Sequence, residues 1–214
     1  YQDEAVLFER SRGFADVEEK IEPHGETIYA MMSMTKPMMG LLVLTLVEEG
    51  ALRLEDPVSK YIPGFANIGV APGGSYDAPL EQTRREVTIF DLMTHTSGLT
   101  YSSGITGFGD VADAYRDLGL MTLESIASSQ WGDLEAQVEK LSQMPLVSQP
   151  GEKFIYSVSM DVLGRVAEIV SGQPLAELFR TRFFEPLDMR SSTFRLANEN
   201  QGRLARVYQP QIRT

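Results

Sequence analysis

The sequence predicts an α+β fold in which a helical subdomain packs on an antiparallel sheet. Two early segments have strand character: residues 4–12 are rich in Val, Leu and Phe, and residues 27–31 follow the turn-like Pro-His-Gly at 23–25. Helical spacing begins near Pro37 and returns in several later segments. Strands and helices that occupy separate parts of a chain are typical of this fold class. We therefore expect a sheet hairpin over residues 1–31 and the helical subdomain over 32–214, in a single domain.

The longest predicted helix begins at Pro37 and ends at Gly50. A glycine at this position favours the left-handed conformation that closes a helix. We expect the buried side of the helix to consist of Leu41, Leu42, Leu44 and Val47.

Further helices are predicted by apolar periodicity over residues 89–94, 134–144, 160–171 and 174–184. Proline and glycine pairs predict loops over 51–65 and 71–78. The glycine-rich residues 101–122 are expected to be irregular.

Composition excludes several classes of protein and site. The net charge is −11, which repels the phosphates of nucleic acid and of anionic lipid, so we expect no nucleic-acid partner. The chain has no cysteine, which excludes disulfides, thiolate metal sites and cysteine nucleophiles. Two histidines without cysteine make a zinc site unfavoured, and we expect neither metal nor cofactor.

No segment has the features of a membrane span or a signal peptide. The most apolar stretch, residues 37–47, is shorter than the roughly 20 residues that cross a bilayer. We expect a cytoplasmic protein, with a periplasmic or secreted one as the alternative if a leader has been removed. The sequence leaves the oligomeric state open.

Ser33 and Lys36 form the first candidate catalytic pair. A serine hydroxyl is a weak nucleophile until a neighbour accepts its proton, and a lysine does this only when burial or nearby positive charge lowers its pKa. Residues three apart on a helix share a face, so Lys36 could reach Ser33 Oγ. With 17 serines and 5 lysines in the chain, about 0.4 such spacings arise by chance. The alternative is an N-cap serine beside a solvated lysine.

Other nucleophile arrangements find less support in the sequence. No serine has glycine two residues before and two residues after it, so the nucleophile elbow of the α/β-hydrolases is absent. Only His24 and His95 could serve in a catalytic triad, and we favour structural roles for both.

Five linked segments carry a family resemblance over nearly the whole chain, to about residue 208. They read SMTK at 33–36, GALRLEDPVSKYIPGF at 50–65, VTIFDLMTHTSGL at 87–99, PGEKFIYSVSMDVLGRVAEIVSGQPL at 150–175 and FFEPLDMRSSTF at 183–194. In this order they resemble the serine β-lactamase and penicillin-binding-protein superfamily. The branch is the one that holds class C β-lactamases, family VIII carboxylesterases, D-aminopeptidases and acyltransferases.

The resemblance implies a β-lactamase/transpeptidase-like fold and three catalytic residues. Ser33 matches the acylated nucleophile, Lys36 its partner and Tyr156 the catalytic tyrosine. A free tyrosine has a pKa of about 10, and a nearby ammonium lowers it by stabilising the phenolate. Lys36 is therefore expected to supply charge as well as to relay a proton. His95 lies in the family's His-Thr-Ser-Gly-Leu segment, where we expect a turn that supports the site, with Gly98 giving backbone freedom.

Two features of the sequence depart from the family. Lactamases and peptidases usually carry asparagine two residues after the tyrosine, where this chain has Val158, which cannot form a hydrogen bond through its side chain. This favours simple esters, with Met32, Tyr101 and Val158 as candidate substrate-binding residues. The family's later Lys/His-x-Gly strand, its further strands and its terminal helix are missing from this chain. We therefore expect residues 1–214 to be an incomplete domain of a longer protein, with the alternative that the remaining elements lie on another chain.

The resulting hypothesis is a serine carboxylesterase that acts on a small-molecule ester through an acyl-enzyme. The alternatives are a β-lactamase or D-amino-acid-specific peptidase acting on a β-lactam-like substrate, an acyltransferase, and a non-catalytic binding module of the same fold.

Overall fold

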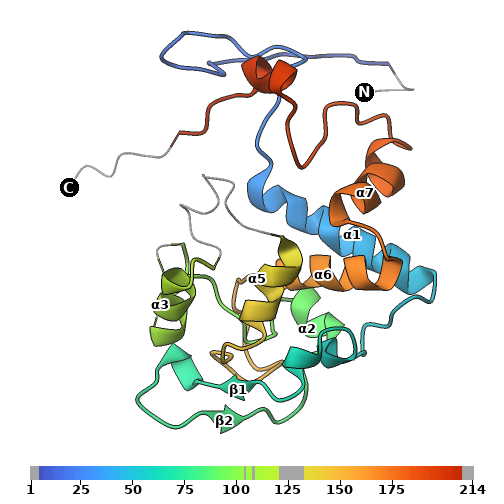
Figure 1. Ribbon diagram of the computed structural model, residues 1–214. Coiled ribbons are helices and arrows are strands. Elements are labelled where there is room, and N and C mark those ends of the chain that lie inside the picture. Colours follow the sequence, from blue (N-terminus) through green and yellow to red (C-terminus); the bar gives the residue numbers. More distant parts are fainter. Residues whose placement is uncertain (1–4, 104, 108, 121–132, 209–214) are drawn as a thin grey trace. The chain divides into compact units, whose positions relative to one another are not determined.

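The structure is a computed structural model that describes residues 5–103, 105–107, 109–120 and 133–208 of the 214-residue chain (Figure 1). The chain divides into two compact units. The first consists of Tyr1–Thr35 and Phe183–Thr214, and the second of Lys36–Arg182. Most of the helices belong to the second unit. None of the helices in the described ranges is long and apolar enough to cross a membrane.

The predicted long helix is present as α1 (Thr35–Glu48), directly after a 3-10 turn at Met32–Met34. Its predicted end is confirmed, because Gly50 is left-handed with φ +72°. The Gly50 N–H donates to Val47 O at 2.9 Å, and the Ala51 N–H donates to Leu46 O at 2.9 Å. These bonds satisfy carbonyls that a helix end would otherwise leave without partners.

The prediction of the buried side of α1 was largely wrong. Leu41 is 54% exposed and Leu44 is 45% exposed, and of the four expected residues only Leu42 is fully buried. The buried residues are Met39, Leu42, Val43 and Leu46. Apolar side chains surround this helix on every side, so its sequence has no polar face that would identify the opposite one.

Within the described residues, the second unit contains the other α-helices and one small sheet. The helices are α2 (Ile89–Met93), α3 (Asp110–Asp117), α5 (Leu134–Leu141), α6 (Ser159–Ser171) and α7 (Leu175–Phe179). Strands β1 (Gly69–Val70) and β2 (Glu81–Gln82) pair antiparallel, with Gly69 opposite Gln82. Short 3-10 turns lie at Val58–Lys60, Pro63–Phe65 and Pro72–Gly74, and a π-helical turn follows α7 at Arg180–Phe184.

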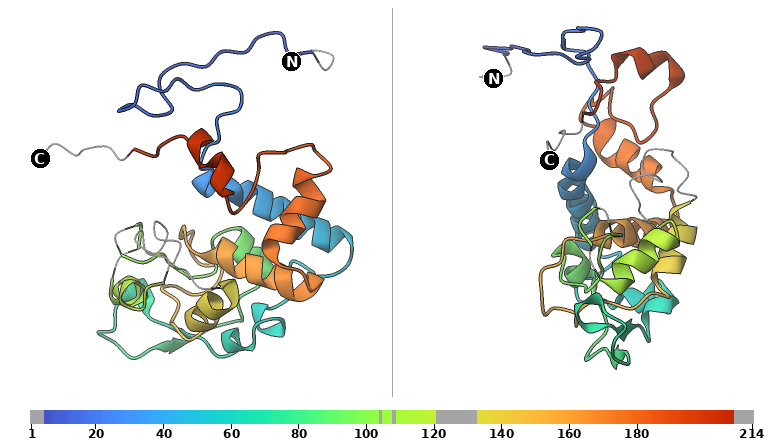
Figure 2. Two further views of the ribbon diagram at one scale, coloured as in Figure 1. Left: turned by 45° about the horizontal axis from the view of Figure 1, so that its top comes forward. Right: turned by 90° about the vertical axis from the view of Figure 1, so that its left-hand side faces the viewer.

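Helix α6 forms the centre of the second unit, where it packs against α2, α5 and α7 (Figure 1, Figure 2). Its core residues Val162, Leu163, Val166 and Ala167 are completely buried. Gly164 allows its neighbours to approach closely, because an added Cβ would lie 3.0 Å from Leu175 and 3.2 Å from Leu134. The α6 core thus joins α2 and α5, which come earlier in the chain, to α7, which follows α6 directly.

Helix α3 lies in the stretch that we expected to be irregular, so that prediction was wrong there. Val111, Ala112 and Tyr115 are buried on one side of α3. Asp110 and Asp113 lie in its first turn, where negative charge is favourable. The glycines that flank residues 110–117 led us to expect a loop, although these residues have the spacing of a short amphipathic helix.

The expected hairpin over residues 1–31 is not found in the part of the chain that the structure describes. Residues 6–12 form no strand, and Ile28 bridges in parallel to Leu204 instead. The Ala205 N–H donates to Ile28 O, and the Arg206 N–H donates to Ala15 O, each at 2.8 Å. A two-stranded hairpin is marginally stable by itself, so pairing with another segment decides the outcome. The first unit also contains a 3-10 helix at Asn198–Arg203.

The turn after α2 is bound to the segment before α6 by backbone hydrogen bonds. The Val147 N–H donates to Gly98 O at 2.7 Å, and the Gly151 N–H donates to Thr96 O at 2.8 Å. Gly98 has φ +84°, which confirms the expected need for backbone freedom. A Cβ at Gly98 would lie 2.3 Å from Ser148 O, so the two segments pack closely because Gly98 has no side chain.

Replacing Gly98 by alanine is expected to lower the free energy of unfolding by about 3 kcal/mol or more, because left-handed strain adds to a backbone clash. Gly172→Ala is a matched control: Gly172 ends α6 with φ +68°, and an added Cβ would meet nothing within 4 Å. It should lose only about 1 kcal/mol. Urea unfolding measures both variants, and equal losses would contradict the importance of the clash.

The buried carboxylate of Asp91 organises the start of α2. Thr88 and Asp91 form a reciprocal capping box. Arg85 binds the carboxylate with two nitrogens, at 2.5 and 2.8 Å. Burial would raise the pKa of Asp91, but hydrogen bonds from Arg85 and Thr88 lower it below its ordinary value. The folded protein therefore needs Arg85 to keep a buried charge paired.

Arg85→Ala is expected to lower the free energy of unfolding by about 2–4 kcal/mol, because Asp91 would stay buried without its cation. Arg190→Ala is the control, since its ion pair with Asp188 is 84% and 71% exposed at the two side chains. That variant should change stability by less than about 0.5 kcal/mol. Chemical unfolding of both proteins near neutral pH checks the difference. Similar values for the two would show that burial of Asp91 does not matter.

Candidate active site

Lys36 and Tyr156, which the sequence pairs only through a family resemblance, lie together in the second unit. Lys36 lies in the first turn of α1, and Tyr156 lies in the segment between Gly151 and α6. The Lys36 Nζ atom lies 4.9 Å from the centroid of the Tyr156 ring and 5.9 Å from that of Tyr101. The two tyrosine rings are 5.7 Å apart between centroids. A half-buried ammonium is thus bordered by two phenols.

The surroundings of Lys36 favour its charged form. Burial acts to lower the pKa of Lys36, but hydrogen bonding to Tyr156 and the nearby Tyr101 phenol raise it by more. The net pKa lies above the ordinary value, so this side chain is an ammonium at neutral pH. Direct proton transfer from Ser33 to Lys36 would need the opposite shift, a lowered lysine pKa.

Ser33 lies in the 3-10 turn at Met32–Met34, three residues before Lys36, and is exposed. The capping position of this turn is occupied by Met31, which does not support the alternative of Ser33 as an N-cap residue. Met32 has a left-handed backbone with φ +48° and is 60% exposed. A positive φ in a non-glycine residue is uncommon and occurs often at functional sites.

Two of the predicted substrate-binding residues have very different positions. Tyr101 is half-buried beside Lys36, and burial followed by the charge of Asp161 raises its pKa. Val158 is completely buried at the start of α6, where its N–H donates to Thr100 O at 3.4 Å. Its side chain belongs to the core, so the structure does not bring it to a surface where a substrate would bind.

His95 packs beneath the catalytic tyrosine candidate. Its ring lies 4.9 Å from the ring of Tyr156 and 5.8 Å from that of Phe154. Burial and, after it, the positive charge of Lys36 lower the pKa of His95 below its ordinary value. A neutral imidazole in this position agrees with the supporting role expected for the turn.

Asp161 is a candidate site residue that the sequence alone did not predict. It lies in the first turn of α6, five residues after Tyr156. Burial raises its pKa to about 6, although the nearby charge of Lys36 acts in the opposite direction. The sequence feature that could have identified it is that Asp161 is the only charged residue in the run 157–164 at the start of α6. A carboxylate that titrates near pH 6 beside an ammonium is typical of a functional site.

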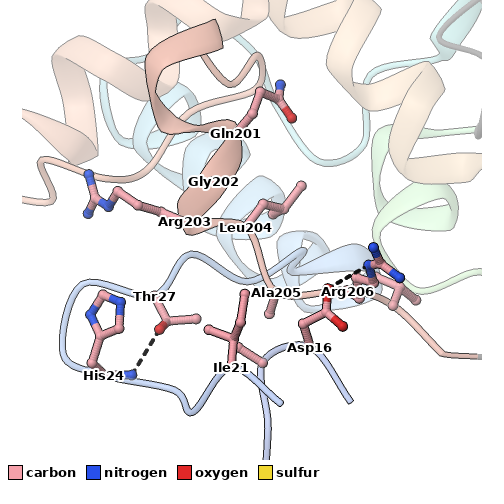
Figure 3. A pocket seen from close by; sticks show the side chains of 12 residues that line it. Asp16, Ile21, His24, Thr27, Gln201, Gly202, Arg203, Leu204, Ala205 and Arg206 are labelled. Atoms are coloured by element: carbon pink, nitrogen blue, oxygen red, sulfur yellow. Dashed lines mark hydrogen bonds and ion pairs between the residues drawn. The ribbon is translucent and has the colours of Figure 1, made fainter. Parts of the chain in front are cut away.

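The first unit contains a separate hollow of about 400 Å³ (Figure 3). Figure 3 shows that two of its charged lining residues, Arg206 and Asp16, pair with each other at 2.8 Å. His24 accepts the Glu26 N–H through Nδ1 at 3.2 Å, which agrees with the structural role expected for it. Among the residues that the structure describes, no group of three His, Asp or Glu side chains could hold a metal ion.

Comparison with known proteins finds that this chain is similar to an esterase and to a hydrolase. Esterase EstB from Burkholderia gladioli is 37% identical over 189 residues, which are 88% of this chain and 44% of that protein. The solved structure of EstCE1, a hydrolase with promiscuous acyltransferase activity, is 32% identical with a TM-score of 0.70. The match covers 90% of this chain and 46% of EstCE1.

A third relative extends the comparison to lactam and peptide chemistry. The structure of a beta-lactamase/D-alanine carboxypeptidase from Yersinia pestis is 25% identical, with a TM-score of 0.66. The match covers 92% of this chain and 49% of that protein, so the chain spans about half the length of these relatives. The family described as Beta-lactamase matches residues 1–213. The chain therefore has a β-lactamase/transpeptidase-like fold and belongs to the beta-lactamase family.

Proposed function

We propose that this chain carries the nucleophile of a serine hydrolase that cleaves carboxylic esters through an acyl-enzyme. The observation that carries the proposal is the Lys36 ammonium, 4.9 Å from the ring of Tyr156 and raised in pKa by hydrogen bonding to it. Two relatives support the proposal: one is named an esterase, which favours ester substrates, and the other is described as a hydrolase, which favours hydrolysis.

In the proposed reaction, Ser33 Oγ attacks the carbonyl carbon of the ester while its proton passes to the Tyr156 phenolate. The tetrahedral intermediate collapses, the C–O bond to the alcohol breaks, and the phenol of Tyr156 returns the proton to the leaving oxygen. Water then attacks the acyl-enzyme in the same way and releases the acid. The backbone N–H of Ser33 is expected to donate to the oxyanion.

Lys36 contributes a constant positive charge in this scheme. Because its pKa is raised, it stays protonated and does not act as the base. An ammonium beside a tyrosine oxygen stabilises the phenolate relative to the phenol. Tyr156 is therefore the proton acceptor and donor, and Lys36 sets the fraction of Tyr156 that is ready to accept. No step of the scheme uses a metal or a cofactor.

The apolar Val158, two residues after Tyr156, favours esters over β-lactams and peptides as substrates. Val158 stands where those enzymes of the superfamily usually carry an asparagine amide, and its side chain is completely buried. A second candidate function is acyl transfer, in which an alcohol or amine replaces water in the second half of the reaction. It is suggested by EstCE1, whose description includes promiscuous acyltransferase activity.

The proposal predicts that Ser33→Ala and Tyr156→Phe abolish most hydrolysis of p-nitrophenyl butyrate by the full chain. We expect Tyr156→Phe to lower kcat by roughly 10²–10⁴-fold, the range typical of general acid–base groups. Tyr76→Phe is the control, because Tyr76 is 46% exposed and lies outside the site. Intact-mass analysis after treatment with a phosphonate ester should show one adduct, which Ser33→Ala removes.

Other results would select one of the alternatives. Nitrocefin turnover well above that of the ester would identify a β-lactamase, and product that depends on an added alcohol or amine would identify an acyltransferase. A folded full chain without turnover and without an adduct at Ser33 would leave only a non-catalytic binding module.

The raised pKa of Asp161 predicts a pH-dependent effect of Asp161→Asn on stability. Between about pH 4 and pH 6 the folded state binds more protons at this residue than the unfolded state, so its contribution to stability falls as pH rises. Asparagine does not titrate. The variant should therefore gain stability relative to wild type from pH 4 to pH 7, by up to about 3 kcal/mol. Thermal or urea unfolding across this range measures the difference, and a difference that stays constant with pH would contradict the burial of the carboxylate.

A further inference from the structure

A row of buried polar side chains lies beside Tyr156 and has no part in the scheme above. Ser97 Oγ lies 2.8 Å from Ser159 Oγ, which lies 2.7 Å from Ser157 Oγ. Ser157 Oγ lies 3.4 Å from His95 Nδ1. The three serines are completely buried, and His95 is 7% exposed. Polar groups are buried at a cost unless they are hydrogen-bonded, so this row has a defined geometry.

The backbone of Ser157 determines which nitrogen of His95 carries the proton. The backbone N–H of Ser157 points at His95 Nδ1 at a distance of 3.3 Å. An N–H group can only donate, so Nδ1 must accept, and the proton of the neutral ring lies on Nε2. A protonated ring would place two N–H groups against each other. Burial and the charge of Lys36, which both lower the pKa of His95, keep the ring neutral.

His95 holds the residues on both sides of Tyr156. Its carbonyl oxygen accepts the N–H of Ile155 at 2.8 Å, and its Nδ1 accepts the N–H of Ser157. Between these two bonds its ring packs against the ring of Tyr156 at an interplanar angle of 40°. One residue thus fixes the backbone before and after the tyrosine, and also the tyrosine ring.

The backbone of His95 has an unusual conformation that makes this arrangement possible. Its φ is +55°, in the left-handed region that non-glycine residues seldom adopt. This conformation ends α2 and turns the carbonyl and the ring toward the same segment. Strain of this kind persists where the surrounding contacts determine it, and it is concentrated at functional sites.

We propose that His95 is a positioning residue which, as a neutral imidazole accepting at Nδ1, holds the phenol of Tyr156 against Lys36. The inference rests on the proposed function, because it assigns His95 a part in aligning the proton acceptor of that reaction. His95 does not touch the substrate in this role.

Two variants separate positioning from folding. His95→Gly keeps the left-handed backbone and the carbonyl that binds Ile155, but it removes the ring and the acceptor for Ser157. His95→Asn also tolerates left-handed backbone and carries an oxygen that can replace Nδ1 as acceptor. For p-nitrophenyl butyrate we expect His95→Gly to lower kcat by about 10²-fold with KM little changed, as a misplaced catalytic group does. His95→Asn should recover at least about a tenth of the wild-type kcat.

Amide hydrogen exchange tests the same geometry without turnover. In His95→Gly, the Ser157 amide should exchange at least about tenfold faster than in wild type, and the Ile155 amide should change little. His95→Asn should restore most of the protection at Ser157. Nitrogen-15 spectra of wild type should show an unprotonated Nδ1 and a protonated Nε2.

The outcomes distinguish failure of this inference from failure of the proposed function. If wild type has no ester turnover but the exchange and tautomer results hold, the proposed function fails and the contact of His95 with the Tyr156 segment stands. Equal kcat loss in the Gly and Asn variants would overturn the inference. So would unchanged Ser157 exchange in His95→Gly, or a protonated Nδ1 in wild type.

Discussion

The candidate site depends on one half-buried positive charge. Lys36 is half-buried beside the rings of Tyr156 and Tyr101, where an ammonium without acceptors would be strongly unfavourable. Hydrogen bonding to the phenols offsets the loss of water and raises the pKa of the lysine. The environment of Lys36 therefore decides its chemistry. Its spacing from Ser33 alone suggests a base, whereas its contacts favour the charged form.

The features that the sequence predicted correctly depend mostly on residues that are neighbours along the chain. Gly50 ends α1 and Gly98 makes the turn after α2, because each left-handed position needs a residue without a side chain. The short helix at Ile89–Met93 is also set by near neighbours, because the Thr88 side chain caps its start by accepting the Asp91 N–H. The nearness of Lys36 and Tyr156 is different: no local rule pairs positions so far apart, and only the family resemblance did.

The predictions that failed depend on what each segment packs against. Leu41 and Leu44 of α1 are as apolar as Leu42, so the sequence could not show which side is buried. The first strand-like segment has β propensity but forms no strand in the described ranges, since propensity yields to the choice of partner. Asp161 was overlooked because a carboxylate near the start of a helix is ordinary, and only its burial beside Lys36 makes it notable.

In the second unit, features that lower stability, such as polar side chains out of water and left-handed backbone, are concentrated near Tyr156. The buried side of α6 is apolar where it packs on the other helices, as at Val162 and Val166. At its first turn, near Tyr156, this gives way to the half-buried carboxylate of Asp161 and to buried hydroxyls, and the left-handed histidine lies beside them. Each of these features is less stable than an apolar, relaxed alternative. A fold that concentrates them around one tyrosine gives up stability there in exchange for a fixed arrangement of charge and hydrogen bonds, as expected of a site where a proton is transferred.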